Sequence, residues 1–152
     1  MKRIVIIALT MLIMVTASAQ EAIFKKYAGQ DGVSVVNISK SMLGLMSGVA
    51  SGDKKVKDLA NKLERIRILT CENHKLVGKV KKDAMQYVGT KGYEELMSSQ
   101  DGGEMVYILQ HPLGGNNYEY VVLSIEKNEV KVSVVNIIGH LTLDEIKAVS
   151  QM

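Results

Sequence analysis

The chain has 152 residues, of which 47% are hydrophobic and 23% are charged, and its formal net charge is +3. This hydrophobic content excludes a disordered chain, and the length fits one domain whose core needs neither a metal nor a disulfide. The small net charge argues against binding to long polyanions, so we expect no nucleic-acid partner.

The first 19 residues have the three parts of a secretory signal peptide. A basic start is followed by the apolar run 4–15 and by small residues up to Ala19. The run is shorter than the roughly 20 residues that a membrane-spanning helix needs. We therefore expect cleavage near Ala19 and a single α+β domain over 20–152 with no transmembrane segment. The mature protein is expected to be periplasmic or secreted.

The first half of this domain alternates between strand and helix patterns. The run Val33–Ile38 is rich in β-branched residues, and both of its faces carry apolar side chains, which suggests a central strand. Helices are indicated by apolar residues spaced three and four apart. In chain order we expect a short helical lead-in at 24–27, a strand at 33–38, a helix at 40–49, a helix capped by Asp53, a strand at 66–71 and a helix at 75–88.

From Tyr93 onward the apolar period changes to two, which is typical of strands. Gly102-Gly103 and Lys127-Asn128 each separate two such runs, as in hairpin loops. Thr142 and Glu145 fit a capping box that opens a last helix. The expected strands are 93–99, 105–111, 118–126 and 129–138.

Helices and meandering strands are segregated along the chain, which favours an α+β layer fold over a wound parallel sheet. We expect a mostly antiparallel sheet of about six strands with helices packed on one face. The other face of such a sheet can be left in contact with water.

The strand 118–126 offers a candidate interaction surface. Its residues Val121, Leu123 and Ile125 alternate with Tyr118 and Tyr120, so a core on the first set leaves the two tyrosines on the outer face. Tyrosine is a common contact residue because it combines a large area with a polar tip. Ordinary cross-strand pairing is the alternative explanation for this pair.

The residues that could carry chemistry do not form a recognisable set. Cys71, the only cysteine, and His74 form half of a metal-ligand pattern, but His111 and His140 lie on separate elements without a second pair. We therefore expect no metal site, no cofactor and no catalytic residues. An enzyme would need a pocket that gathers Cys71, a histidine and an acid from distant segments.

Three lysines share one face of the helix at 75–88, opposite its apolar side. Lys75, Lys79 and Lys82 could form an anion or membrane-surface patch, but a solvated helix face has the same pattern. We interpret them as a solvated face.

Several short segments, taken in order, resemble a known family. They are Phe24 with Tyr27, Val33-Ser34-Val35 leading to Ser39-Lys40 and Met42, Gly92-Tyr93-Glu94-Glu95-Leu96-Met97, and Ile138-Gly139 with Leu141 and Leu143. In these the chain resembles the secreted bacterial proteins grouped as domain of unknown function 4252. The resemblance implies a Gram-negative cell-envelope protein and suggests an accessory role in envelope signalling. It brings no activity, ligand or catalytic residue.

Together these observations predict a non-enzymatic periplasmic binding or interaction module. Its partner would be an envelope protein or a small ligand, neither of which the sequence identifies. Two other functions stay open, an unrecognised envelope enzyme and a structural envelope component that works as an oligomer.

Overall fold

The computed structural model describes residues 19–49, 53–90 and 92–151, so the predicted leader lies outside the described residues apart from Ala19. The helices are α2 (Ala19–Tyr27), α3 (Lys40–Val49), α4 (Lys54–Lys62), α5 (Val77–Thr90) and α6 (Leu143–Ser150). The strands are β1 (Val33–Ser39), β2 (Leu63–Cys71), β3 (Glu94–Asp101), β4 (Glu104–Gly114), β5 (Asn117–Ile125) and β6 (Val132–Gly139).

All the strands join one six-stranded sheet in the order β1-β2-β6-β5-β4-β3, and every neighbouring pair is antiparallel. The predicted α+β class and the antiparallel sheet are thereby confirmed. The central position predicted for β1 is wrong, because β1 pairs only with β2 and forms an edge. Its two apolar faces have another cause: Val33 and Val35 pack on one side of the sheet and Ile38 packs on the other.

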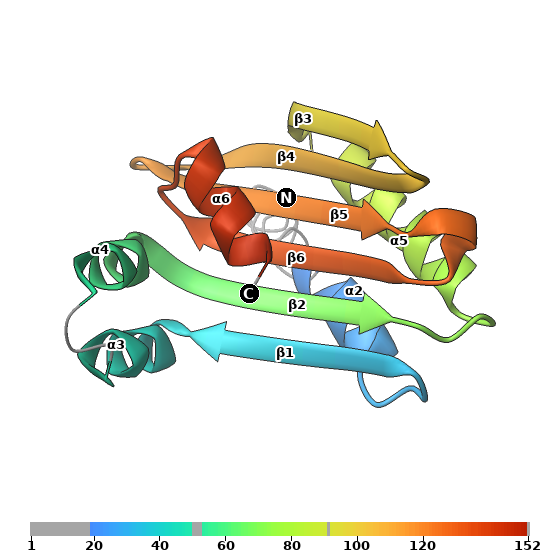
Figure 1. Cartoon of the computed structure of the whole chain (residues 1–152), viewed down its shortest axis with the longest axis horizontal. Coiled ribbons are helices and arrows are strands. Elements are labelled where there is room, and N and C mark those ends of the chain that lie inside the picture. Colours follow the sequence, from blue (N-terminus) through green and yellow to red (C-terminus); the bar gives the residue numbers. More distant parts are fainter. Residues whose placement is uncertain (1–18, 50–52, 91, 152) are drawn as a thin grey trace, which may run out of the picture.

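Helices cover both faces of the sheet, so the predicted packing on one face is wrong (Figure 1). Helices α2 and α5 bury Phe24 and Val80 against one face, in a core that includes Leu69 and Leu123. On the other face α6 packs over the neighbouring strands β5 and β6, and α3 and α4 lie beside the end of β2. The pattern of an amphipathic helix shows that one of its sides is buried, but not which face of a sheet it meets.

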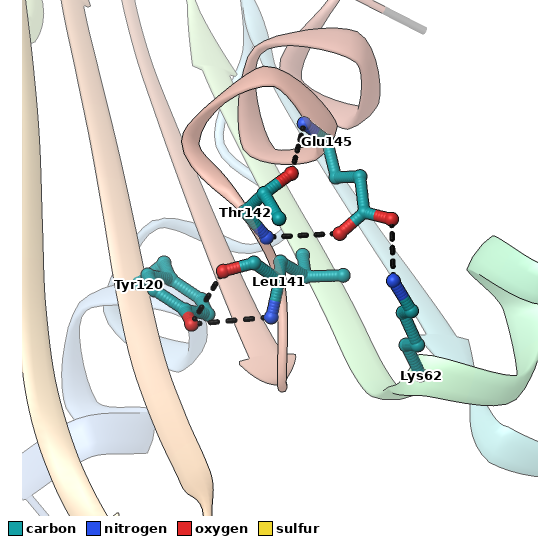
Figure 2. Close-up of polar contacts among 5 residues, drawn as sticks. All are labelled: Lys62, Tyr120, Leu141, Thr142 and Glu145. Carbon is teal, nitrogen blue, oxygen red and sulfur yellow. Dashed lines mark hydrogen bonds and ion pairs between the residues drawn. The ribbon is translucent and has the colours of Figure 1, made fainter.

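Both predicted helix caps are present. The Asp53 carboxylate accepts a hydrogen bond from the backbone N–H of Lys55 at 3.0 Å. At the start of α6 the Thr142 hydroxyl accepts from the Glu145 N–H at 3.3 Å, and the Glu145 carboxylate accepts from the Thr142 N–H at 2.8 Å (Figure 2). Each cap satisfies backbone donors that have no partner within the helix.

Strand β6 begins at Val132, three residues later than predicted from the period-two pattern. Residues 127–129 form a short 3-10 turn in which Asn128 and Glu129 have positive φ angles of 60° and 54°. Backbone in this left-handed conformation cannot continue a strand ladder.

Helices α2 and α5 are joined by a polar contact at the edge of their shared core. The Asp83 carboxylate accepts from the Lys26 ammonium at 2.6 Å and from the Tyr27 hydroxyl at 2.8 Å. The hydrogen bond from Lys26 lowers the pKa of Asp83 below its usual value, and the bond from Tyr27 acts in the same direction. The ionised carboxylate is therefore the form that the folded protein favours.

Replacing Asp83 with asparagine should cost at most about 1 kcal/mol near neutral pH, because solvent screens this partly exposed pair. A carboxyl group whose pKa is depressed by folding contributes stability above its unfolded pKa and loses that contribution as the pH falls through its folded pKa. The stability gap between wild type and Asp83→Asn should therefore be constant from pH 5 to pH 8 and shrink below about pH 4. Urea unfolding across this range measures the gap, and a gap that widens in acid would contradict the assignment.

Candidate functional site

Tyr120, one of the two tyrosines of the predicted interaction surface, is buried under α6 and only 2% exposed. Its hydroxyl donates to the Leu141 carbonyl oxygen at 3.1 Å and accepts from the Leu141 N–H at 3.2 Å (Figure 2). Leu141 lies in the connection from β6 to α6, so Tyr120 fixes the point where the chain turns onto the sheet. The prediction that Tyr120 stands on an exposed face is wrong.

Tyr118 is half-buried beside it. Its ring is stacked against that of Tyr120 with centroids 6.0 Å apart, and it lies 6.2 Å from the ring of His140. The alternation within β5 was correct, since Val121, Leu123 and Ile125 do face the α2–α5 core. The outer face of this part of the strand is covered by α6, so the tyrosine pair forms no open surface.

The Tyr120 hydroxyl can be tested alone. Tyr120→Phe keeps the ring but leaves the buried Leu141 amide group without its partner, and should lower the free energy of unfolding by about 1.5 kcal/mol. Tyr118→Phe is the matched control, because the Tyr118 hydroxyl makes no hydrogen bond to another described residue. The control should change stability by no more than about 0.5 kcal/mol in urea denaturation. Equal effects of the two substitutions would be inconsistent with the Tyr120–Leu141 contact.

The residues considered for metal or nucleophilic chemistry are not assembled into a site. Cys71 is completely buried in the core between the sheet and α2 and α5, whereas His74 is exposed in the turn that precedes α5. His140 is exposed after β6, and His111 lies on β4 against the ring of Tyr93. In the part of the chain that the structure describes, no group of three or more His, Cys, Asp or Glu side chains is arranged to hold a metal ion.

A buried polar cluster on the α5 side of the sheet was not predicted. At its centre is Glu119, which is 0% exposed and accepts hydrogen bonds from the Tyr87 hydroxyl at 2.7 Å, the Tyr93 hydroxyl at 2.5 Å and the Asn136 side-chain amide at 2.6 Å. Arg67 is also buried and stands opposite Asn136 in the β2–β6 register. We call Glu119, Tyr87, Tyr93, Asn136 and Arg67 the buried polar cluster.

The protonation and burial of this cluster indicate that it stabilises the fold and does not bind a ligand. Burial raises the pKa of both phenols, and the neighbouring Glu119 carboxylate acts in the same direction on Tyr87 and on Tyr93. Both hydroxyls therefore keep their protons at neutral pH and act as donors. A ligand would have no access to the Glu119 carboxylate, because that side chain has no exposed surface.

A groove of about 700 Å³ lies on the face of the sheet that carries α6. It lies beside the last residues of α6, which form one wall. Two parallel rows of side chains cross its floor from β2 to β3. The first row is apolar and follows the strand register through Ile68, Val135, Val122, Ile108 and Met97. Its three middle residues are at most 4% exposed, so only its ends are accessible.

The second row carries hydroxyl groups. In the same strand order it contains Thr70, Ser133, Ser124, Val106 and Ser99. Neighbouring strands lie about 4.8 Å apart, so each row extends for about 19 Å across five strands. We call these two rows and the space above them the sheet groove.

Charged side chains border the sheet groove on the side of its hydroxyl row. Glu104 accepts a hydrogen bond from the Ser124 hydroxyl at 2.8 Å, and Lys131 lies 3.5 Å from Glu126. Lys147 comes from α6 on the opposite wall. The floor of the sheet groove therefore changes from apolar to hydroxyl-bearing, and charged side chains stand on both of its sides. The sequence shows these residues but not the register that aligns them.

The helix predicted at 75–88 starts two residues later than expected, so Lys75 lies in the turn before α5, while Lys79 and Lys82 lie on the helix. All three lysines are exposed, as expected of solvated residues. Among the described helices, none has the length and apolar character needed to cross a bilayer.

A scan against family models matches residues 27–149 to the domain of unknown function DUF4252. Comparisons with curated proteins and with solved structures gave no match. The family match covers the sheet groove, the buried polar cluster and most of the α6 helix. The chain therefore belongs to the family of the domain of unknown function 4252.

Proposed function

We propose that this protein is an exported, non-enzymatic binding module of the cell envelope and that the sheet groove is its binding surface. The observation that carries the proposal is the pair of adjacent rows on the floor of the groove, in which the hydroxyl row is accessible along its length and the apolar row is accessible at its ends, Ile68 and Met97. A surface of this kind favours an elongated ligand with an apolar side and an edge of hydrogen-bonding groups. The ligand would be a small molecule or a segment of an envelope protein.

A binding role fits the described residues better than an enzyme. Cys71 and Glu119, the residues whose chemistry would serve catalysis best, are completely buried. The acids that reach the sheet groove already have partners, since Glu104 accepts from Ser124 and Glu126 lies beside Lys131. Export is supported by the three-part leader of the sequence.

The test compares a photo-crosslinking side chain at two adjacent positions of β3. Ser99 lines the sheet groove, whereas Ser98 points to the opposite face of the sheet because neighbours in a strand alternate. Both residues are exposed, so neither replacement should disturb the core. Full-length variants are expressed in the native host, irradiated in intact cells, and analysed by mass spectrometry.

We expect a defined adduct at Ser99 that is absent at Ser98. An added mass of a few hundred daltons would indicate a small ligand, and a discrete larger complex would indicate a protein segment. Identical adducts at both positions, or no adduct at Ser99, would refute the sheet groove as the binding surface.

A further inference from the structure

Helix α3 carries an apolar stripe that is exposed to solvent. Met42, Leu45, Met46 and Val49 are 51%, 67%, 40% and 83% exposed. At 3.6 residues per turn these four side chains fall within one arc of about 100° around the helix. Leu43, which projects to a neighbouring side, is the residue by which α3 contributes to the core.

The stripe continues onto α4. Met46 and Val56 line the same small apolar pocket of about 70 Å³, together with Leu59 and Ala60 behind them. Val56 is itself 40% exposed. Figure 1 shows the two helices side by side at the end of the sheet where β1 ends and β2 begins. We call Met42, Leu45, Met46, Val49 and Val56 the α3–α4 patch.

Cations border this patch. Lys55 and Lys57 lie about 100° to either side of Val56 around α4, and Lys54 is at the start of the same helix. None of these three lysines forms an ion pair with another described residue. Helix α3 contains no acidic residue. Apolar side chains bordered by unpaired lysines are the arrangement of helices that lie in a membrane interface.

We propose that the α3–α4 patch docks the protein onto the surface of an anionic lipid bilayer. The apolar side chains would enter the boundary between head groups and acyl chains, and Lys55 and Lys57 would meet the lipid phosphates. This role is separate from ligand binding in the sheet groove, because no residue of the α3–α4 patch lines that groove.

The size and charge of the patch favour a bilayer over a second copy of the chain. Helix α3 has 10 residues and is therefore about 15 Å long. A stable dimer usually buries about 800 Å² on each partner, far more than a single stripe on so short a helix provides. Lysine is also depleted in the buried centres of protein interfaces, whereas it is common at membrane surfaces.

The experiment is flotation of the exported protein with vesicles of phosphatidylcholine alone or with an equal part of phosphatidylglycerol. Two paired variants test the patch, Leu45→Ser with Val49→Ser and Lys55→Gln with Lys57→Gln. The matched control is Lys79→Gln with Lys82→Gln, which removes the same charge from exposed positions on α5. All variants share one N-terminus, so differences between them report on the substituted positions.

Wild type should bind the phosphatidylglycerol vesicles and not those of phosphatidylcholine alone, and added salt should weaken binding. The Lys55→Gln, Lys57→Gln variant should bind about 25-fold more weakly than wild type, and the Leu45→Ser, Val49→Ser variant at least about tenfold more weakly. The control variant should bind at most about twofold more weakly. Three results would overturn the proposal: no binding by wild type, binding that the patch variants leave unchanged, or equal weakening by the control pair.

Sedimentation of the same samples tests whether a second copy of the chain, rather than a bilayer, covers the α3–α4 patch. A dimer that disappears in the Leu45→Ser, Val49→Ser variant would assign the patch to a second copy and reject the bilayer. A wild type that stays monomeric while it binds the anionic vesicles is the expected result. Photo-crosslinking at Ser99 is independent of this outcome, so failure of one proposal does not affect the test of the other.

Discussion

Replacing Glu119 with alanine is expected to lower the free energy of unfolding by about 3–5 kcal/mol. The substitution leaves the hydroxyls of Tyr87 and Tyr93 and the amide of Asn136 without the carboxylate to which they donate. Arg67, which is buried opposite Asn136 in the β2–β6 register, stays desolvated in the variant. Loss of one member of a buried charged network is costly because the other members stay desolvated.

Urea denaturation followed by circular dichroism measures this loss. Glu119→Gln keeps the shape of the side chain and one of its two acceptor oxygens. It should therefore lose roughly half as much stability as the alanine variant. Glu95→Ala is the control for removal of a glutamate, since Glu95 is exposed on β3, and should change stability by no more than about 0.5 kcal/mol. A Glu119→Ala protein within about 1 kcal/mol of wild type would contradict the buried polar cluster.

A double-mutant cycle attributes the loss to the network. Glu119 and Tyr93 should couple by at least about 1 kcal/mol when Glu119→Gln is combined with Tyr93→Phe. The glutamine variant is chosen for the cycle because it is expected to lose less stability than the alanine variant. Additive effects would show that Glu119 stabilises the fold by packing alone.

The position of Glu119 could have been predicted from the strand pattern. Val121, Leu123 and Ile125 were correctly assigned to the core, and Glu119 shares their parity in β5. In β6, Asn136 similarly interrupts an otherwise apolar run. A polar residue in register with core residues predicts a buried network. Two of its donors, however, come from α5 and from the residue that precedes β3, and the approach of these segments to β5 is a tertiary contact.

The errors have a common physical cause, which is that local patterns do not specify long-range contacts. The apolar side chains of β1 indicate two covered faces but not the strand order that puts β1 at the edge. The capping box of α6 was predicted, yet only the packed structure shows that this helix covers Tyr120. The sheet groove depends on the register of five strands, so no single segment shows it.

Among the glycines that the structure describes, Gly139 is expected to be the least tolerant of change, and Gly139→Ala should cost about 3 kcal/mol or more. A Cβ at this position would lie 2.3 Å from the Lys62 carbonyl oxygen and 3.2 Å from the Leu63 Cα. These are backbone atoms of the junction between α4 and β2, so no side-chain rotation relieves the clash. The His140 N–H also donates to that Lys62 oxygen at 3.1 Å, and this bond would be strained.

The same substitution at Gly44 is the control, because nothing lies within 4 Å of a Cβ there. Gly44 is inside α3, where alanine should raise stability by about 0.5–1 kcal/mol. The two Gly→Ala variants should therefore shift the urea midpoint in opposite directions. Hydrogen exchange adds a local measurement, since the His140 amide should lose protection in the Gly139→Ala protein. Wild-type stability together with full protection of His140 would show that the α4–β2 junction does not approach β6 this closely.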